Sequence, residues 1–184
     1  MACNLRPFRD YDEHDVINLF TLSGDITNGV TKGHLVHVPE SGYGWLNTDE
    51  LQRLGAVGST YTNTVSDRYG VNAKVGVALS GSTLLGMTLY DVKETDENGE
   101  KYVFNPRKAA ENDVVISGQA VPILTRGIVL YSGSQLATDD PSAGATLYSD
   151  NNGELTTTSG GGSAVGIALG GKDADNAVLV RINL

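Results

Sequence analysis

One strand opening recurs along this chain and constrains its fold more than any other feature. The pattern Gly-x-x-Leu-Tyr begins at Gly86, at Gly127 and at Gly144. After the third copy the chain continues through a polar Asp-Asn-Asn-Gly corner at residues 150–153 and a second apolar stretch. Asn and Gly accept the positive φ that tight turns require, so residues 144–157 predict a β-hairpin. A chain that repeats one strand opening in this way is predicted to be all-β.

The composition agrees with a β fold. The chain has 23 glycines against 5 prolines and many Thr, Val and Ser, and no long window collects the usual helix formers. A domain of 184 residues buries roughly 70% of its unfolded surface. It therefore needs no disulfide, and the lone Cys3 offers neither a disulfide framework nor a Cys-x-x-Cys metal set. These features are consistent with assembly in a reducing cytosol.

The charge excludes some partners. The net charge is -9 and the 13 basic residues are scattered, whereas a nucleic-acid backbone requires clustered Lys and Arg. No apolar h-region begins the sequence, and no run approaches the roughly 18 apolar residues of a membrane span. We therefore expect a soluble protein that binds neither nucleic acid nor a membrane directly.

Several segments have strand or helix character. Residues 16–22 and 31–39 predict two early strands, and residues 177–184 predict a last strand with Val178, Val180 and Ile182 facing the core. Short helical turns are expected at residues 48–54 and at 105–112, the second with Pro at its first position. The remaining strands are expected at residues 74–81, 114–116, 120–124 and 164–171.

Two of these strands are similar to each other. Residues 74–81 and residues 164–171 share a Val-Gly-(Val/Ile)-Ala-Leu strand that runs into a glycine turn. We interpret the pair as a weak internal duplication. Two pseudo-equivalent halves of one closed sheet would produce it, and so would two small barrels.

The first 15 residues form a charged segment with three apolar residues. It is either a frayed terminus or an extended arm that docks on a neighbouring subunit through its aromatic side chains, and the aromatics favour docking. The candidate contact residues in it are Leu5, Arg6, Phe8, Arg9 and Tyr11.

A second group of aromatic residues lies in the irregular segment 40–73. Tyr43 stands between Gly42 and Gly44, Trp45 follows at once, and Tyr61 lies in a Thr- and Ser-rich stretch. These side chains either line a glycan groove, where aromatic rings stack on sugars, or pack against the rim of the barrel. We include Tyr43 and Trp45 among the candidate contact residues.

Residues with catalytic or metal-binding potential are few. His34 and His37 are three apart, so on one strand they point to opposite faces and cannot share a metal. The Asp-containing corners at residues 96–99 and 150–153 lack EF-hand spacing and are explained as turns. No Gly-x-Ser-x-Gly elbow is present, and Cys3 lies in the N-terminal segment, far from any histidine that we expect to be buried. We expect no enzyme activity, no metal site and no cofactor.

The order of short motifs resembles that of the decoration, or cement, proteins of tailed-bacteriophage heads. The similarity covers most of the chain after residue 15. The motifs that carry it are Thr-Lys-Gly-x-Leu-Val at 31–36, Val-Gly-Val-Ala-Leu at 75–79, Ser-Gly-Gln-Ala-Val at 117–121, Arg-Gly-Ile-Val-Leu at 126–130, Ala-Gly-Ala-Thr-Leu-Tyr at 143–148, Asn-Gly-Glu-Leu-Thr at 152–156, Val-Gly-Ile-Ala-Leu at 165–169 and Val-Leu-Val-Arg at 178–181.

This resemblance implies a compact β-barrel or β-tulip body with an N-terminal arm at residues 1–15 and a single domain at residues 16–184. Residues 40–73 and 84–113 depart from the family pattern as insertions. The resemblance also implies a function: a protein made in the host cytoplasm that sits on the outer surface of the virion head and bridges major capsid protein subunits as a dimer or trimer. The alternative is a glycan-binding β module displayed on a virion, with Tyr43, Trp45 and Tyr61 as its stacking platform.

Overall fold

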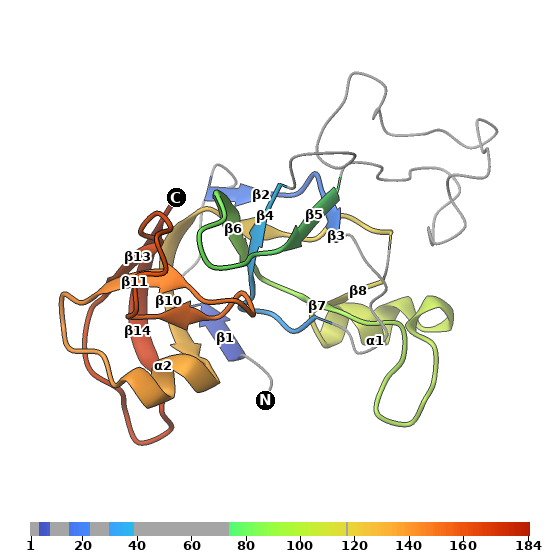
Figure 1. The fold of residues 1–184 in the computed structure, drawn as a ribbon. Coiled ribbons are helices and arrows are strands. Elements are labelled where there is room, and N and C mark those ends of the chain that lie inside the picture. Colours follow the sequence, from blue (N-terminus) through green and yellow to red (C-terminus); the bar gives the residue numbers. More distant parts are fainter. Residues whose placement is uncertain (1–3, 8–14, 23–29, 39–73, 117) are drawn as a thin grey trace.

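The computed structural model describes residues 15–22, 30–38, 74–116 and 118–184, together with the backbone of residues 4–7. Two six-stranded sheets and a small lobe make up the described part (Figure 1). We call the sheet that contains the last strand the outer sheet. In order across this sheet, its strands are β1 (Asn4–Pro7), β10 (Arg126–Ser132), β14 (Val178–Asn183), β13 (Gly166–Ala168), β11 (Thr146–Ser149) and β12 (Leu155–Thr156).

The second sheet, which we call the central sheet, lies between the outer sheet and the lobe (Figure 1). All its neighbouring strands are antiparallel except the last pair, β5 and β3. In order, its strands are β2 (Val16–Ile17), β9 (Ile123–Leu124), β6 (Leu84–Thr88), β4 (Leu35–His37), β5 (Lys74–Val77) and β3 (Thr21–Leu22). The prediction of a compact, barrel-like all-β fold is confirmed.

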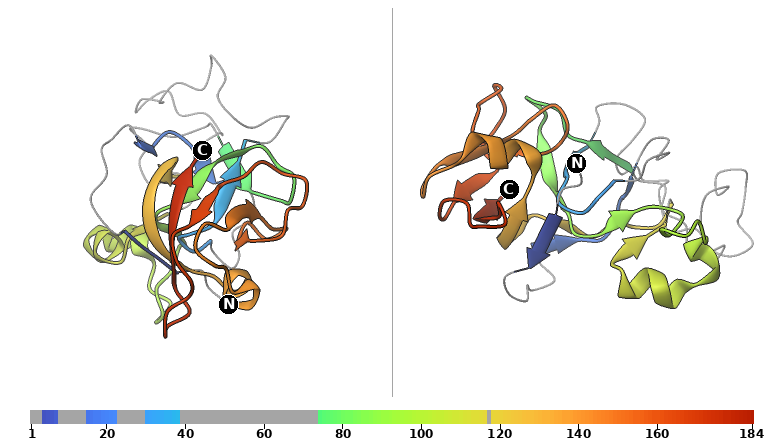
Figure 2. Two further views of the ribbon diagram at one scale, coloured as in Figure 1. Left: turned by 90° about the vertical axis from the view of Figure 1, so that its left-hand side faces the viewer. Right: turned by 90° about the horizontal axis from the view of Figure 1, so that it is seen from below.

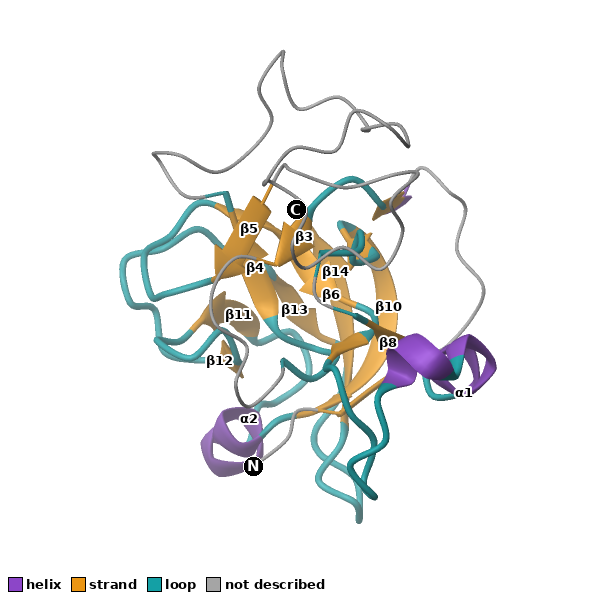
Figure 3. Cartoon of the chain, turned by 90° about the vertical axis from the view of Figure 1, so that its right-hand side faces the viewer, coloured by secondary structure: helices purple, strands orange, loops and turns teal. Residues whose placement is uncertain are grey.

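The lobe comprises residues 91–115 and projects from the central sheet, on the side away from α2 (Figures 2 and 3). Its elements are the parallel pair β7 (Asp91–Val92) and β8 (Val114–Val115), the 3₁₀ turn Tyr102–Phe104, which we call η3, and helix α1 (Pro106–Glu111). A second helix, α2 (Ser134–Asp139), lies on the outer sheet side. Among the described residues no helix is long and apolar enough to cross a membrane.

The central sheet is curled, because its two edge strands are close together in sequence. Three residues separate β2 from β3, and β2 and β3 are the opposite edges of the sheet. The four Cα–Cα steps from Ile17 to Thr21 span at most about 14 Å. Six strands laid flat would place their edges about 24 Å apart. A register shift between Val36 and His37 adds to the bend.

This topology corrects the prediction of one strand over residues 16–22. Val16 and Ile17 pair with β9, whereas Thr21 and Leu22 pair with β5. The segment is rich in strand formers throughout, but the curled sheet draws its two halves to different partners. Phe20, between them, is 8% exposed and belongs to the cluster enclosed by this sheet.

The two sheets bury their side chains differently. In β14, Val178, Val180 and Ile182 are fully buried while Arg181 and Asn183 are exposed, which confirms the predicted alternation. In β4 the neighbours Leu35 and Val36 are both fully buried, one in each of the two large apolar clusters. The outer sheet therefore has one core face, whereas the central sheet is covered on both faces.

The larger cluster joins the two sheets. It brings Leu35, Met87 and Leu124 of the central sheet against Val129, Tyr131, Leu147, Leu155, Val178, Val180 and Ile182 of the outer sheet. Tyr131 is the largest fully buried side chain, and its hydroxyl accepts a hydrogen bond from Leu155 N at 3.2 Å. A buried tyrosine hydroxyl without such a partner would be costly.

The hairpin predicted at residues 144–157 is confirmed. Strands β11 and β12 pair Tyr148 with Thr156 and Ser149 with Leu155. The Gly-x-x-Leu-Tyr pattern marks a strand each time, although Gly86 and Gly127 lie inside β6 and β10 and Gly144 precedes β11.

Three corners use the same side-chain device. Asp96, Asp150 and Asp173 each accept hydrogen bonds from the backbone N–H groups two and four residues ahead, at 2.7 to 2.9 Å. The third residue after each aspartate has positive φ. Asp96 and Asp150 therefore build turns, as predicted, and the third corner was missed because Asn176 occupies the position that glycine holds in the others.

Helix α1 forms as its local signals predict. Pro106 is its first residue, and the Asn105 side chain accepts a hydrogen bond from Lys108 N at 3.2 Å. Helix α2 was not predicted. Its N-terminus is capped by Glu154 of the hairpin, whose carboxylate accepts hydrogen bonds from Ser134 Oγ at 2.9 Å and Gln135 N at 3.0 Å.

Several domain predictions fall on particular elements. Within residues 1–15, Asn4–Pro7 form β1, which pairs antiparallel with β10 of the same chain. Within the expected insertion 84–113, Leu84–Thr88 form β6 in the interior of the central sheet. The similar segments form β5 and β13, which lie in different sheets. The segment 40–73, with its expected helix at 48–54, lies outside the described residues. The domain boundaries and the duplication stay predictions.

Gly153 is the point at which the hairpin meets the central sheet. Its carbonyl accepts a hydrogen bond from Leu35 N at 2.7 Å, and its φ is 73°. A Cβ at this position would lie 2.6 Å from Val77 Cγ1 and 3.0 Å from Leu35 O. Gly99 has the same place in its own corner, with φ 80°, but no atom lies within 4 Å of its Cβ position.

We predict that G153A destabilises the protein more than G99A does. Both substitutions force alanine into the left-handed region, at about 1 kcal/mol each. Only G153A adds a clash between the sheets, at about 1–3 kcal/mol more. Urea unfolding of the two variants measures the difference, and equal midpoints would contradict a tight junction at Gly153.

Asp139 fastens the end of α2 to the hairpin. Burial of its carboxylate raises the pKa, but hydrogen bonds from Thr156 Oγ1, Thr157 N, Gln135 Nε2 and Thr157 Oγ1 outweigh that effect, so the pKa lies below its ordinary value of 3.8.

We predict that D139N lowers the free energy of unfolding by about 1–2 kcal/mol at pH 7. A carboxyl with a lowered folded-state pKa stabilises the protein above its unfolded pKa and loses that effect as the pH falls through the folded value. The gap between wild type and D139N should therefore close below about pH 4. The control is D175N, which changes an exposed aspartate; a pH-independent gap, or an equal loss in D175N, would contradict the assignment.

Candidate functional site

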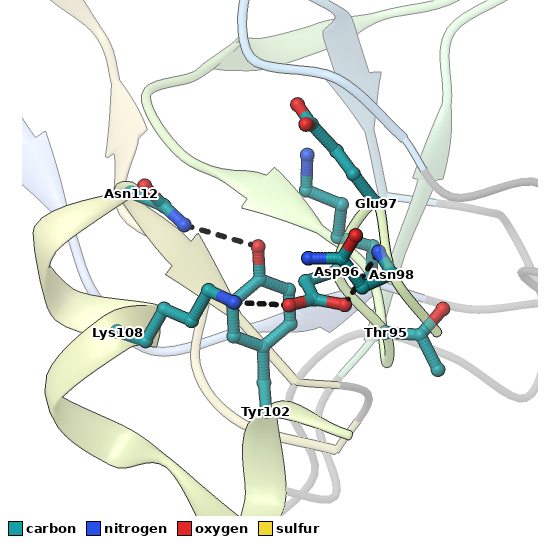
Figure 4. Close-up of a pocket in the computed structure, with 8 residues that line it drawn as sticks. Thr95, Asp96, Glu97, Asn98, Tyr102, Lys108 and Asn112 are labelled. Atoms are coloured by element: carbon teal, nitrogen blue, oxygen red, sulfur yellow. Dashed lines mark hydrogen bonds and ion pairs between the residues drawn. The ribbon is translucent and has the colours of Figure 1, made fainter. Parts of the chain in front are cut away.

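A hollow of about 640 Å³ lies in the lobe, between the corner at residues 95–101 and helix α1 (Figure 4). Lys108 reaches across it from α1 and donates a hydrogen bond to the Asp96 carboxylate, whose side chain is only 4% exposed. On the other wall, Asn112 Nδ2 donates to the Tyr102 hydroxyl at 3.2 Å. The hollow is thus bridged by contacts between its own walls.

Ion pairs shift the pKa values of three charged groups that line the hollow, so that each group favours its charged form. The hydrogen bond from Lys108 is the main cause that holds the pKa of Asp96 below its usual value, and the same bond raises the pKa of Lys108. The hydrogen bond with Asp91, at 2.8 Å, raises the pKa of Lys93. Both lysines therefore stay protonated and Asp96 stays ionised at neutral pH. Groups fixed in this way hold the corner to the helix and are poorly suited to exchanging protons with a substrate.

A second hollow, of about 390 Å³, lies where the two sheets meet, and it is lined by hydroxyl and amide groups. Ser80 N donates to Asn151 Oδ1 and Ser80 Oγ donates to Gly160 O, each at 3.3 Å. The Asp150 carboxylate beside them is used by its own corner. The polar groups of this hollow link loops of the two sheets.

The histidines in the described part do not form a joint site. His34 precedes β4, and its Nδ1 lies 2.8 Å from Thr31 O. His37 is in β4, where its Nδ1 is buried without a hydrogen-bond partner. Among the described residues, no three His, Cys, Asp or Glu side chains are placed to hold a metal ion.

The most unusual surface feature is an exposed aromatic side chain on the lobe. Phe104 is 82% exposed and its neighbour Val103 is 39% exposed, whereas Tyr102 beside them is 4% exposed. Other exposed large apolar side chains in the described part are Leu19, Val38, Leu79, Leu169 and Leu184, at 36–54%. An exposed phenylalanine on a hydrogen-bonded turn, beside a second exposed apolar side chain, is a candidate for a binding surface.

The sequence-predicted contact residues are placed only in part. Leu5 and Arg6 belong to β1 at the edge of the outer sheet. The other five, Phe8, Arg9, Tyr11, Tyr43 and Trp45, lie outside the described residues, as does Tyr61. The contact role of all seven residues stays a prediction.

Sequence reasoning missed Phe104, although a local signal was present. A large apolar residue just before a helix N-cap usually packs against the fourth helical residue. Here the N-cap is Asn105 and the fourth helical residue is Ala109, which is buried in the lobe and short. Nothing in the local sequence is therefore long enough to cover Phe104.

A comparison with protein-family models identifies a family to which most of the chain is similar. The family model for phage cement proteins matches residues 55–184, which include β5 to β14 and the whole lobe. No match was found among curated proteins or among solved structures. The matched residues make up most of the chain and contain in full seven of the eight motifs that carry the resemblance. The chain therefore belongs to the phage cement protein family.

Proposed function

We propose that this chain is a structural virion protein that decorates the outer surface of a phage head and stabilises it by bridging subunits of the major capsid protein. Membership of the phage cement protein family carries the proposal, because it indicates a structural role in association with capsid proteins. The protein is made in the host cytoplasm and acts without catalysis or a cofactor.

The architecture suits a protein that must transmit force between neighbours. The two sheets share one apolar cluster, and the central sheet is buried on both faces, so the layers cannot slide without exposing core side chains. Strand pairs such as β10 with β14 connect residues far apart in sequence. A clamp of this kind resists deformation because its core is close-packed.

The contact surfaces proposed from the sequence remain part of this proposal. Residues 1–15 contribute Leu5, Arg6, Phe8, Arg9 and Tyr11, and the segment 40–73 contributes Tyr43 and Trp45. We propose that the protein is a dimer or trimer on the shell, as its resemblance to capsid decoration proteins implies. Neither nucleic acid nor a membrane is a direct partner of the acidic chain.

The test adds purified protein to expanded heads of its phage prepared without it. We expect saturable binding and a rise in the temperature at which the heads disrupt, because a ligand that binds only the intact shell stabilises it. Cosedimentation measures binding, a thermal melt measures stability, and light scattering gives the mass of the free protein.

An acidic protein of similar size that is unrelated to phage heads, added to the same heads, serves as the control for charge alone. No binding, or binding that leaves the disruption temperature unchanged, would refute the proposed function.

A further inference from the structure

Phe104 is held in an exposed position by its backbone. The turn η3 places it between the buried Tyr102 and the N-cap of α1. Tyr102 N donates to Glu94 O at 2.9 Å, Phe104 N donates to Lys101 O at 3.1 Å, and Asn105 N donates to Tyr102 O at 2.9 Å. The ring is thus presented on a fixed turn, which lowers the entropy lost when a partner buries it.

The turn is anchored in a small core of the lobe. Tyr102 packs with Ala109, Val114 and Ile116, a cluster separate from the two large ones. The ion pair of Lys108 with Asp96 closes the other side of the lobe (Figure 4). A partner could therefore bury Phe104 without any change in the packing of the two large apolar clusters.

The short segment that contains Phe104 is basic, although acidic residues, Glu100 and Glu111, lie on either side of it. Residues 101–108 contain three basic residues and no acidic one, although the chain carries a net charge of -9. Lys101 is exposed and makes no ion pair among the described residues, and the Arg107 side chain is 89% exposed. Arg107 pairs with Glu111 in full contact with water, where such pairs are weak, so its guanidinium can also engage a partner.

We infer that the surface formed by Lys101, Val103, Phe104 and Arg107, which we call the Phe104 surface, docks into an apolar pocket with an acidic rim on the capsid shell protein. This inference rests on the proposed function, since family membership is what names the shell as the partner. A central aromatic side chain with basic residues beside it is a common composition for the centre of a protein interface.

A second copy of the chain fits the Phe104 surface less well than the shell does. In a two-fold contact through this surface, Lys101 and Arg107 would face their own counterparts, and like charges repel. An acidic nucleic-acid backbone would be repelled by the rest of the molecule in the same way. A partner whose carboxylates lie only around one pocket attracts the basic residues of the Phe104 surface and does not attract the acidic remainder of the chain.

The experiment compares wild type, F104D and L79D in binding to the expanded heads that lack the protein. Leu79 is 54% exposed, and its neighbour Ser80 bonds to loops of the outer sheet, so L79D makes the same kind of change far from the lobe. We expect F104D to bind at least about tenfold more weakly than wild type and L79D to bind within about twofold of it. Urea midpoints establish that each variant is folded.

Lys101→Glu provides a second variant that leaves the aromatic ring and the turn in place. We expect it to weaken binding at low salt and to reduce the dependence of binding on salt, because a charge beside an interface acts mainly through long-range attraction. If F104D does not fold, this variant decides the question, and wild-type affinity and salt dependence in Lys101→Glu would overturn the inference.

The outcomes separate the inference from the proposed function. Failure of wild type to bind refutes the function and the inference with it. Binding of wild type together with equal binding of F104D, or equal loss in F104D and L79D, overturns the inference alone. A fall in the solution mass of the free protein on F104D substitution would show that a second copy covers Phe104, which would also overturn it.

Discussion

The link between β2 and β3, only three residues long, sets the shape of the central sheet. It ties opposite edges of the central sheet within about 14 Å of each other and so forces that sheet to curl. The concave side then encloses Phe20, Val36 and Val75, while the other face packs on the outer sheet. The lobe contributes Val92 and Val115 to the enclosed cluster. The curl of the central sheet thus lets it pack on the outer sheet with one face and on the lobe with the other.

The junction between the sheets depends on close approach at one corner. Gly153 brings its carbonyl to Leu35 N because it has no side chain to meet Val77. Asp150 holds the same corner by accepting two backbone hydrogen bonds, and Glu154, the next residue after Gly153, caps α2. A turn that is merely local in sequence therefore joins three parts of the fold. Its carboxylates satisfy backbone N–H groups that would otherwise be left unpaired.

The lobe differs from the sheets because it pairs charged side chains and leaves a large apolar side chain exposed. Its charged groups pair with one another, Lys108 with Asp96 across the hollow and Lys93, which lines the hollow, with Asp91, while Phe104 is left in water. The lobe thus uses its charges to hold its own fold together and exposes an aromatic ring. This arrangement supports a role in binding another protein, as membership of the phage cement protein family indicates.

Features whose causes are local could be predicted from the amino-acid sequence. The alternation in β14, the hairpin of β11 and β12, the corners at Asp96 and Asp150 and the capped start of α1 all follow from side-chain period, turn residues and capping groups within a few positions. Features that depend on distant partners became visible in the folded chain. Residues 16–22 form two strands because their first half pairs with β9 and their second half pairs with β5. Helix α2 forms because hydrogen bonds of Glu154 and Asp139 hold its two ends against the hairpin. Phe104 is exposed because no part of the described chain covers it. A hydrogen bond or contact between residues far apart in the chain leaves no periodic signal at either end. The exposure of Phe104 had one local signal, the short Ala109 at the fourth position of α1, but its place on the surface of the lobe was decided by the folded chain.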